Sequence, residues 1–141
     1  MVASDNVRSN DGIIQDDIDH LKMALVVLAT TRGIPQLYYG TEIGMTNPNS
    51  DSHGEIRSDF PGGWDGDIRN AFEGKNLTKE QTELHSFSKK LFNYRKNSEL
   101  IHNGKLIHFV PENGVYCYFR TLGSKNLMVV LNKNSKDVEL E

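Results

Sequence analysis

Residues 33–42 read Gly-Ile-Pro-Gln-Leu-Tyr-Tyr-Gly-Thr-Glu, and this stretch decides the expected fold. Residues 34–39 form a compact segment that does not alternate between apolar and polar side chains, which is typical of a strand buried on both faces of a parallel sheet. Such a strand needs neighbours, yet no other segment of the chain has this pattern. The stretch therefore predicts one strand of a larger α/β protein, of which this chain is the last part.

A helix is expected immediately before this strand, over residues 16–32. Apolar side chains recur along it at spacings of three and four, at Ile18, Leu21, Leu25 and Leu28. Gly33 can adopt the left-handed conformation that ends a helix, and Pro35 cannot continue one because it lacks a backbone N–H. The helix and the strand together are half of a repeating unit in a parallel α/β fold.

A long loop and a second helix are expected after the strand. Residues 43–77 have neither a helical nor a strand period, and stretches of this length without regular structure are usually functional or disordered. Three aromatic residues favour an anchored loop over disorder, and these are Phe60, Trp64 and Phe72. Thr78 and Gln81 have the spacing of a capping box, so a helix is expected over residues 78–96.

Residues 102–141 change to the alternating pattern of antiparallel strands, with a turn at Pro111-Glu-Asn-Gly114. Strands are expected at residues 105–110, 115–122, 127–131 and 138–140. The expected fold class is thus α/β plus all-β. Residues 1–101 supply a helix, a strand, a loop and a helix, and residues 102–141 begin an antiparallel β domain.

Composition argues against several classes of function. The 141 residues carry 16 Lys and Arg against 19 Asp and Glu, a net charge of -3 without a basic block, so nucleic-acid binding is not expected. No apolar run approaches the roughly 18 residues that a membrane helix needs. The single Cys117 cannot form an intrachain disulfide. No secretory signal follows Met1, and the compartment, periplasmic or cytoplasmic, stays undetermined.

Ligands of parallel α/β proteins bind at the carboxyl ends of the strands, which here means around Glu42. The loop beyond it adds carboxylate, imidazole, guanidinium and indole groups, a mixture suited to a ligand with many hydroxyls. The candidate substrate-binding residues are Arg57, Asp51, His53, Trp64 and Glu42. The alternative is a solvated loop whose Trp64 fills its own base.

Metal sites are not indicated by the sequence. A calcium loop that starts at Asn49 fails because its twelfth residue is Phe60, where a bidentate Glu is required. The five histidines lack the short spacing of a zinc site. No cofactor is therefore expected.

The stretch at residues 33–42 resembles the Gly-x-Pro-x-x-Tyr-Tyr-Gly-x-Glu segment of the α-amylase family of glycoside hydrolases, in which it forms the eighth strand of a (β/α)8 TIM barrel. Thr30-Thr-Arg32 and Arg57-Ser-Asp-Phe-Pro-Gly-Gly-Trp64 look most like the neopullulanase and cyclomaltodextrinase branch. The resemblance implies that residues 1–101 are the last segment of the catalytic barrel. It implies that residues 102–141 begin a truncated antiparallel β-sandwich C-terminal domain.

The resemblance also implies retaining cleavage of α-glucosidic bonds by carboxylates at the ends of strands four, five and seven. The strand-seven Asn-His-Asp would fall near the start of this chain, where Ala3-Ser4-Asp5 lacks the Asn and His, so Asp5 receives no catalytic role. No catalytic residue is expected in the chain. The family's loop after strand eight lends an acidic residue and an Arg to a donor-side sugar, for which Arg57 with Asp51 or His53 is the candidate set.

The leading hypothesis is a C-terminal fragment of an α-glucan or cyclodextrin hydrolase, which contacts a maltooligosaccharide and is inactive in isolation. The first alternative is a stand-alone, non-catalytic carbohydrate-binding or assembly module. The second is an α+β domain whose resemblance is only ancestral. Leu37 and Tyr39 would lack barrel partners in the isolated chain, so self-association is expected.

Overall fold

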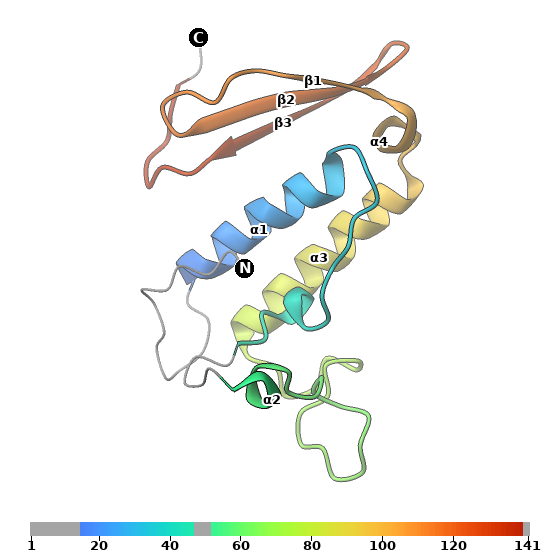
Figure 1. Cartoon of the computed structure of the whole chain (residues 1–141), viewed down its shortest axis with the longest axis vertical. Helices are drawn as coiled ribbons and strands as arrows, with labels where there is room; N and C mark the ends of the chain where they lie inside the picture. Colours follow the sequence, from blue (N-terminus) through green and yellow to red (C-terminus); the bar gives the residue numbers. More distant parts are fainter. Residues whose placement is uncertain (1–14, 47–51, 140–141) are drawn as a thin grey trace. The chain divides into compact units, whose positions relative to one another are not determined.

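The structure is a computed structural model that describes residues 15–46 and 52–139 (Figure 1). Its helices are α1 (Gln15–Thr30), the 3-10 helix η1 (Thr41–Ile43), α2 (His53–Ile56), α3 (Lys79–Asn97) and α4 (Glu99–Asn103), and its strands are β1 (Lys105–His108), β2 (Val115–Leu122) and β3 (Lys125–Asn132). The chain forms two compact units, residues 1–24 with 36–90 and residues 25–35 with 91–141. The two long helices, α1 and α3, each contribute to both units.

The first unit buries one large apolar side chain from each of its two long helices. Ile18 on α1 and Leu84 on α3 are fully buried, as amphipathic helices require of their core-facing positions. Lys22 of α1 forms an ion pair with Glu83 of α3. The ion pair raises the pKa of Lys22, although burial works in the opposite direction.

Two helix starts are specified by local sequence. At α3, the Thr78 hydroxyl accepts a hydrogen bond from the Gln81 backbone N–H and the Gln81 side chain accepts one from the Thr78 N–H, both at 3.2 Å. At α4, the Ser98 hydroxyl accepts a hydrogen bond from the Ile101 N–H at 3.3 Å. These side chains satisfy N–H groups that have no partner inside the helix, which is why short motifs locate both starts.

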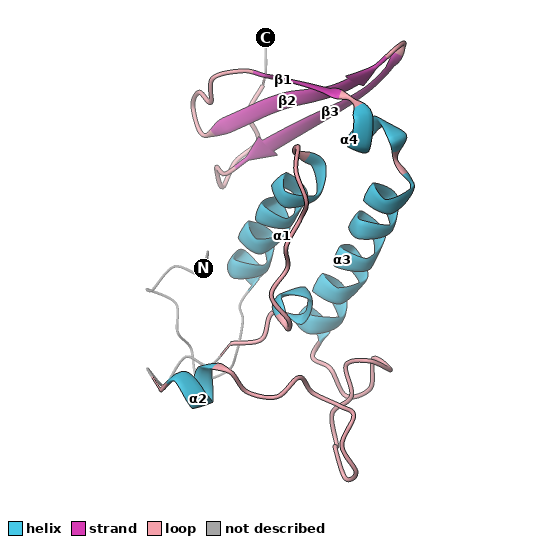
Figure 2. Ribbon diagram, turned by 45° about the vertical axis from the view of Figure 1, so that its right-hand side comes forward, coloured by secondary structure: helices cyan, strands magenta, loops and turns pink. Residues whose placement is uncertain are grey.

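The second unit contains a three-stranded antiparallel sheet in the order β1-β2-β3 (Figure 2). Asn113 and Gly114, with φ of 51° and 76°, form the turn before β2, and Gly123, with φ of 59°, lies in the turn before β3. Tyr118 of β2 lies opposite Val129 of β3 in the sheet, and both side chains are buried. The sheet therefore directs one face toward the core of its unit.

Arg120 of β2 is the most unusual residue of this core, because its side chain is 1% exposed. Its guanidinium donates to the carbonyl of Thr30 at 2.9 Å, to that of Ile101 at 2.6 Å and to that of Gly104 at 2.7 Å. These carbonyls lie at the ends of α1 and α4, where helix dipoles favour a cation. Burial and the charges of other arginines nearby lower the pKa of Arg120, and the three carbonyls offset the cost of burying its charge.

A second guanidinium, that of Arg95, binds carbonyls at the C-terminal end of α1. Arg95 of α3 donates to the carbonyls of Ala29 and Gly33, each at 2.6 Å, and to that of Thr31 at 3.4 Å. The last turn of α1 has no basic residue of its own. Its orphan carbonyls are thus satisfied by side chains that come from residues more than 60 positions later in the chain.

The structure differs from the sequence expectation at residues 34–39, which form no strand. Ile34 is 97% exposed and Tyr38 is 61% exposed, so the segment is not buried either. A strand exists only through hydrogen bonds to a neighbour, and the described part of the chain provides no parallel partner for it. The (β/α)8 barrel accordingly stays a prediction. Helix α1 ends at Thr30, two residues before the expected end, because Thr30 and the following carbonyls bond to arginines rather than within the helix.

Smaller differences concern the loop and the last strand. The stretch expected to be a loop, residues 43–77, contains the short helix α2 and an isolated bridge between Asn70 and Lys75. Residues 138 and 139 form no strand. Within residues 15–46 and 52–139, no helix combines the length and the apolar character that a membrane crossing requires.

The face of the sheet opposite Tyr118 and Arg120, which we call the outer face, is also apolar. Alternation along the strands places there Ile107, Cys117, Phe119, Met128 and Val130. Ile107, Met128 and Val130 are exposed, and Phe109, next to β1, packs its ring at 6.1 Å from that of Phe119 while remaining exposed itself. A sheet with two apolar faces is typical of a structure with a layer on each side.

We expect Arg120→Met to lower the free energy of unfolding by about 3 kcal/mol or more, because three buried carbonyls lose a charged donor. Arg32→Met is the matched control, since Arg32 is exposed and its removal should change stability by less than about 0.5 kcal/mol. Urea unfolding followed by circular dichroism measures both. Equal unfolding free energies for the two variants would contradict a stabilising role for the buried Arg120 guanidinium.

We expect stability to fall at alkaline pH through Tyr118. Burial raises the pKa of the Tyr118 phenol, whose hydroxyl is hydrogen-bonded to that of Thr30. The folded chain therefore keeps this proton to a higher pH than the unfolded chain, and stability declines above about pH 10, the unfolded pKa of tyrosine. Unfolding free energies of wild type and Tyr118→Phe should differ by a constant amount up to about pH 9 and converge above it. A difference that stays constant to pH 11 contradicts this, and Tyr94→Phe, at an exposed position, controls for general alkaline effects.

We propose that the isolated chain self-associates through the outer face, because exposed apolar patches on a sheet favour contact with another surface. Sedimentation velocity should show species larger than a monomer, and the double variant Phe109→Lys with Met128→Lys should shift them toward the monomer. Val138→Lys changes an exposed apolar residue away from the strands and should leave the distribution unchanged. A compact monomer for the wild type at micromolar concentration would refute self-association.

Candidate functional site

The candidate site lies in the first unit, where the chain turns sharply after its two adjacent tyrosines. Gly40 has a φ of 84° and its carbonyl accepts hydrogen bonds from the N–H groups of Ile43 and Met45, at 3.2 and 2.9 Å. A Cβ on Gly40 would lie 2.4 Å from the sulfur of Met45, so only glycine fits. This turn sets η1, and with it Glu42, directly after the tyrosines.

Tyr39 connects this turn to the loop beyond α2. Its hydroxyl donates to the carbonyl of Ser58 at 3.1 Å, and its ring centroid lies 4.7 Å from that of Tyr38. Partial desolvation, then the neighbouring Tyr38 and the carboxylate of Asp59, raise the pKa of the Tyr39 phenol, while the positive charge of Arg57 lowers it. Tyr38, Arg57 and Asp59 thus act on the phenol of Tyr39, and all four residues are exposed; we call this set the tyrosine cluster.

The five residues predicted from sequence have different outcomes. Asp51 lies outside the described residues. Arg57, directly after α2, is exposed and belongs to the tyrosine cluster. His53 is exposed at the first position of α2. Glu42 is half-buried, and one of its carboxylate oxygens has no hydrogen-bond partner among the described residues.

Trp64 lies on a loop that is ordered by other residues. The rings of Phe60 and Phe72 stack with centroids 4.8 Å apart, and the Ala71 N–H donates to the carbonyl of Pro61 at 2.8 Å. Trp64 itself is 70% exposed, so the alternative in which it fills the base of its own loop is wrong. Its indole is therefore open to solvent and to a ligand.

The tyrosines and Asp59 are not among the five candidates predicted from the sequence, although Asp59 belongs to the same polar loop and the tyrosines precede Glu42 directly. The tyrosines were assigned to a strand buried on both faces, whereas Tyr39 is 43% exposed and Tyr38 more so. The available signal was their position at the carboxyl end of that stretch, next to Gly40. In the described part of the chain, no group of three or more His, Cys, Asp and Glu side chains is placed to hold a metal ion.

The sheet region of the chain matches a known family. Residues 106–141 match the model of the cyclo-malto-dextrinase C-terminal domain. This region contains most of β1 and all of β2 and β3, so the three-stranded antiparallel sheet corresponds to the C-terminal domain of α-amylase-family enzymes.

Longer relatives match most of the chain. The maltogenic alpha-amylase of Bacillus acidopullulyticus is 30% identical over 128 residues, which cover 88% of this chain and 19% of the relative. The cyclomaltodextrinase of Thermoanaerobacter pseudethanolicus is 29% identical over 119 residues, which cover 84% of this chain and 18% of the relative. The chain thus spans about a fifth of the length of these curated relatives.

A solved structure shows the same fold. The crystal structure of AmyP in complex with maltose superposes with a TM-score of 0.69 over 92% of this chain and 27% of that chain, at 20% sequence identity. Likeness at this identity concerns the fold alone. Together with the relatives and the matched C-terminal domain, it confirms the resemblance of this chain to the α-amylase family, in its cyclomaltodextrinase-like branch.

Proposed function

We propose that this chain is the C-terminal part of a retaining α-glucan or cyclodextrin hydrolase and contributes substrate contacts rather than catalytic carboxylates. The observation that carries the proposal is the similarity over more than four-fifths of the chain to a maltogenic alpha-amylase and a cyclomaltodextrinase. Retaining glycosidases place two carboxyl groups about 5 to 5.5 Å apart. In the proposed enzyme these groups come from other strands of the barrel, and the isolated chain is inactive.

The tyrosine cluster and the loop after it supply the proposed substrate contacts. Arg57 and Asp59 offer a donor group and an acceptor group at the same exposed surface as the rings of Tyr38 and Tyr39. Charged groups form strong hydrogen bonds to hydroxyls, and aromatic faces cover the C–H surface of a sugar ring. Trp64 adds a further exposed aromatic face on the next loop. His53, Glu42 and Asp51 remain proposed contacts.

The barrel is part of the same proposal. In it, α1, residues 34–39 and α3 form the last helix, strand and helix of the (β/α)8 barrel. Support comes from the exposure of Ile34 and Tyr38, because large apolar side chains in a non-alternating segment are normally covered by neighbouring strands. The unpartnered carboxylate oxygen of Glu42 is consistent with a donor from another strand.

We expect Arg57→Ala to weaken maltoheptaose binding to the chain by about tenfold or more, since a hydrogen bond to a charged group contributes about 1.5 to 3 kcal/mol. Nuclear magnetic resonance titration of the labelled chain, read at residues 52–66, measures the dissociation constant. Arg69→Ala is the matched control, because Arg69 is an exposed arginine of the same unit. Unchanged binding in Arg57→Ala would remove Arg57 from the proposed site.

The lack of catalysis is tested separately. The chain should release no reducing sugar from maltoheptaose or β-cyclodextrin, and turnover by the isolated chain would overturn the assignment of catalysis to other strands. Reading the coding sequence upstream of Met1 discriminates the two leading hypotheses. An in-frame Asn-His-Asp and two earlier catalytic carboxylates would establish the hydrolase, whereas their absence together with saturable binding would favour the stand-alone carbohydrate-binding module.

A further inference from the structure

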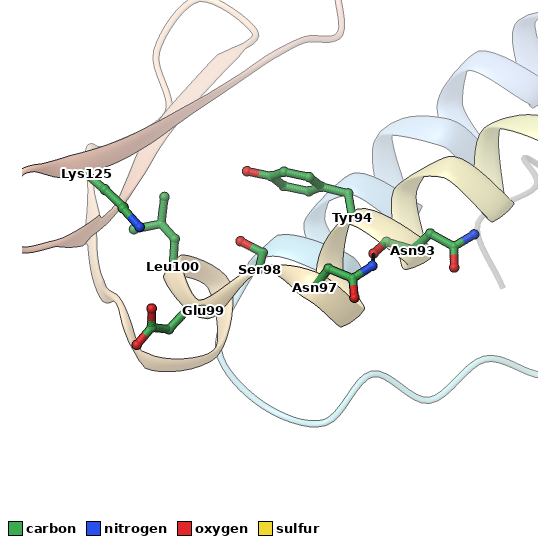
Figure 3. Close-up of a pocket in the computed structure, with 7 residues that line it drawn as sticks. All are labelled: Asn93, Tyr94, Asn97, Ser98, Glu99, Leu100 and Lys125. Atoms are coloured by element: carbon green, nitrogen blue, oxygen red, sulfur yellow. Dashed lines mark hydrogen bonds between the residues drawn. The ribbon is translucent and has the colours of Figure 1, made fainter.

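The second unit has a pocket that the proposed function does not use. Its volume is about 650 Å³, and it is lined by the last turns of α3, by the first residues of α4 and by the turn between β2 and β3 (Figure 3). This volume falls within the range of about 300 to 1,000 Å³ that is typical of small-molecule sites. The pocket therefore has room for a ligand of several sugar rings or of comparable size.

An aromatic ring and polar groups of both signs meet in this pocket. Figure 3 shows the Tyr94 ring directed from α3 toward Leu100 and Lys125. Tyr94 is 48% exposed, so much of its ring is open to solvent. The pocket is also lined by the side-chain amides of Asn93 and Asn97, the carboxylate of Glu99 and the ammonium group of Lys125.

The side chains that line the pocket favour some classes of ligand over others. Phosphate is disfavoured because the single cation, Lys125, shares the pocket with the Glu99 carboxylate. A purely apolar ligand is disfavoured because Leu100 is the only aliphatic side chain. A sugar satisfies the whole set, since its hydroxyls both donate and accept hydrogen bonds and its C–H face stacks on an aromatic ring.

The framework around the pocket is built before any ligand binds. The Asn97 side chain donates to the Asn93 carbonyl at 2.9 Å, and the Ser98 N–H donates to the Arg95 carbonyl at 3.1 Å. Lys125 begins β3 and pairs with Leu122 across the turn. These bonds fix the backbone positions from which the side chains of Tyr94, Glu99 and Lys125 project, so the backbone of the site needs no reordering on binding.

We propose that this pocket, which we call the Tyr94 pocket, is a second carbohydrate-binding site, in which Tyr94 stacks on a sugar ring and Glu99, Lys125 and the two amides bind its hydroxyls. The polyhydroxylated class of ligand follows from the lining, whereas the choice of an α-glucan rests on the proposed function. The Tyr94 pocket lies in the second unit and Arg57 lies in the first, so binding at the pocket can be tested independently of Arg57.

The test uses the full chain carrying Arg57→Ala and Trp64→Ala, so that binding at the other surface is suppressed. Titration with maltoheptaose should shift the amide resonances of residues 93–100 and 125. Adding Tyr94→Ala should weaken this binding by roughly two- to tenfold, as expected for the loss of one aromatic stacking contact. Tyr94→Phe keeps the ring and should retain most of the affinity, and Val138→Ala, which changes an exposed apolar residue outside the pocket, should have no effect.

Three results would overturn the proposal. The first is the absence of saturable shifts at residues 93–100 while the chain remains folded by circular dichroism. The second is equal weakening by Tyr94→Ala and Val138→Ala, which would mean that binding depends on general stability. The third is a stronger response at the same resonances to inorganic phosphate than to maltoheptaose, which would make the pocket an anion site. Loss of binding at residues 52–66 alone would contradict the proposed function and leave the Tyr94 pocket intact.

Discussion

The C-terminal end of α1 is the constraint on which the second unit depends. In the folded chain its last residues are buried or half-buried, so water cannot satisfy their carbonyls, and its last turn has no basic residue that could do so. Two guanidinium groups do so instead, Arg95 from α3 and Arg120 from β2. Because Arg120 also binds the carbonyls of Ile101 and Gly104, one cation joins α1, α4 and the sheet. The unit is therefore organised around a polar centre, with Tyr118 and Val129 packed as its apolar surroundings.

The elements that sequence located well are those specified by nearby residues. The capping pair at Thr78 and the turn at Gly114 act over a few positions, so their motifs identify a helix start and a hairpin without knowledge of the rest of the fold. Residues 34–39 are different, because an apolar segment becomes a strand only when a neighbour supplies hydrogen bonds. The role of Arg120 was also hidden. Its alternation with Tyr118 places it on the inward face, but the carbonyls that make burial tolerable come from distant segments.

The candidate site was predictable in its location and only partly in its members. The rule that ligands bind at the carboxyl ends of strands led to the region after Tyr39, and the positive charge of Arg57 from the following loop acts on the phenol of that tyrosine, while the site itself stays a prediction. The link itself, a hydrogen bond from the Tyr39 hydroxyl to the backbone of Ser58, leaves no trace in the sequence because any residue at position 58 has a carbonyl. The exposure of Trp64 could likewise not be read from the sequence, because an aromatic residue in a loop can be either buried or exposed.

Two apolar surfaces of the chain support the proposal of a larger enzyme in different ways. Residues 34–39 expose Ile34 and Tyr38 on a segment that pairs with no strand in the described part of the chain, as a single strand of a parallel sheet would without its neighbours. The outer face exposes apolar side chains on a sheet whose own hydrogen bonds are complete between its strands, which is what one layer of a sandwich would show without the second layer. The first surface lacks strand pairing and part of its side-chain cover, whereas the second lacks only cover. The proposed barrel followed by a β-sandwich would cover both surfaces, whereas the alternative of a self-contained α+β domain would need another partner for each.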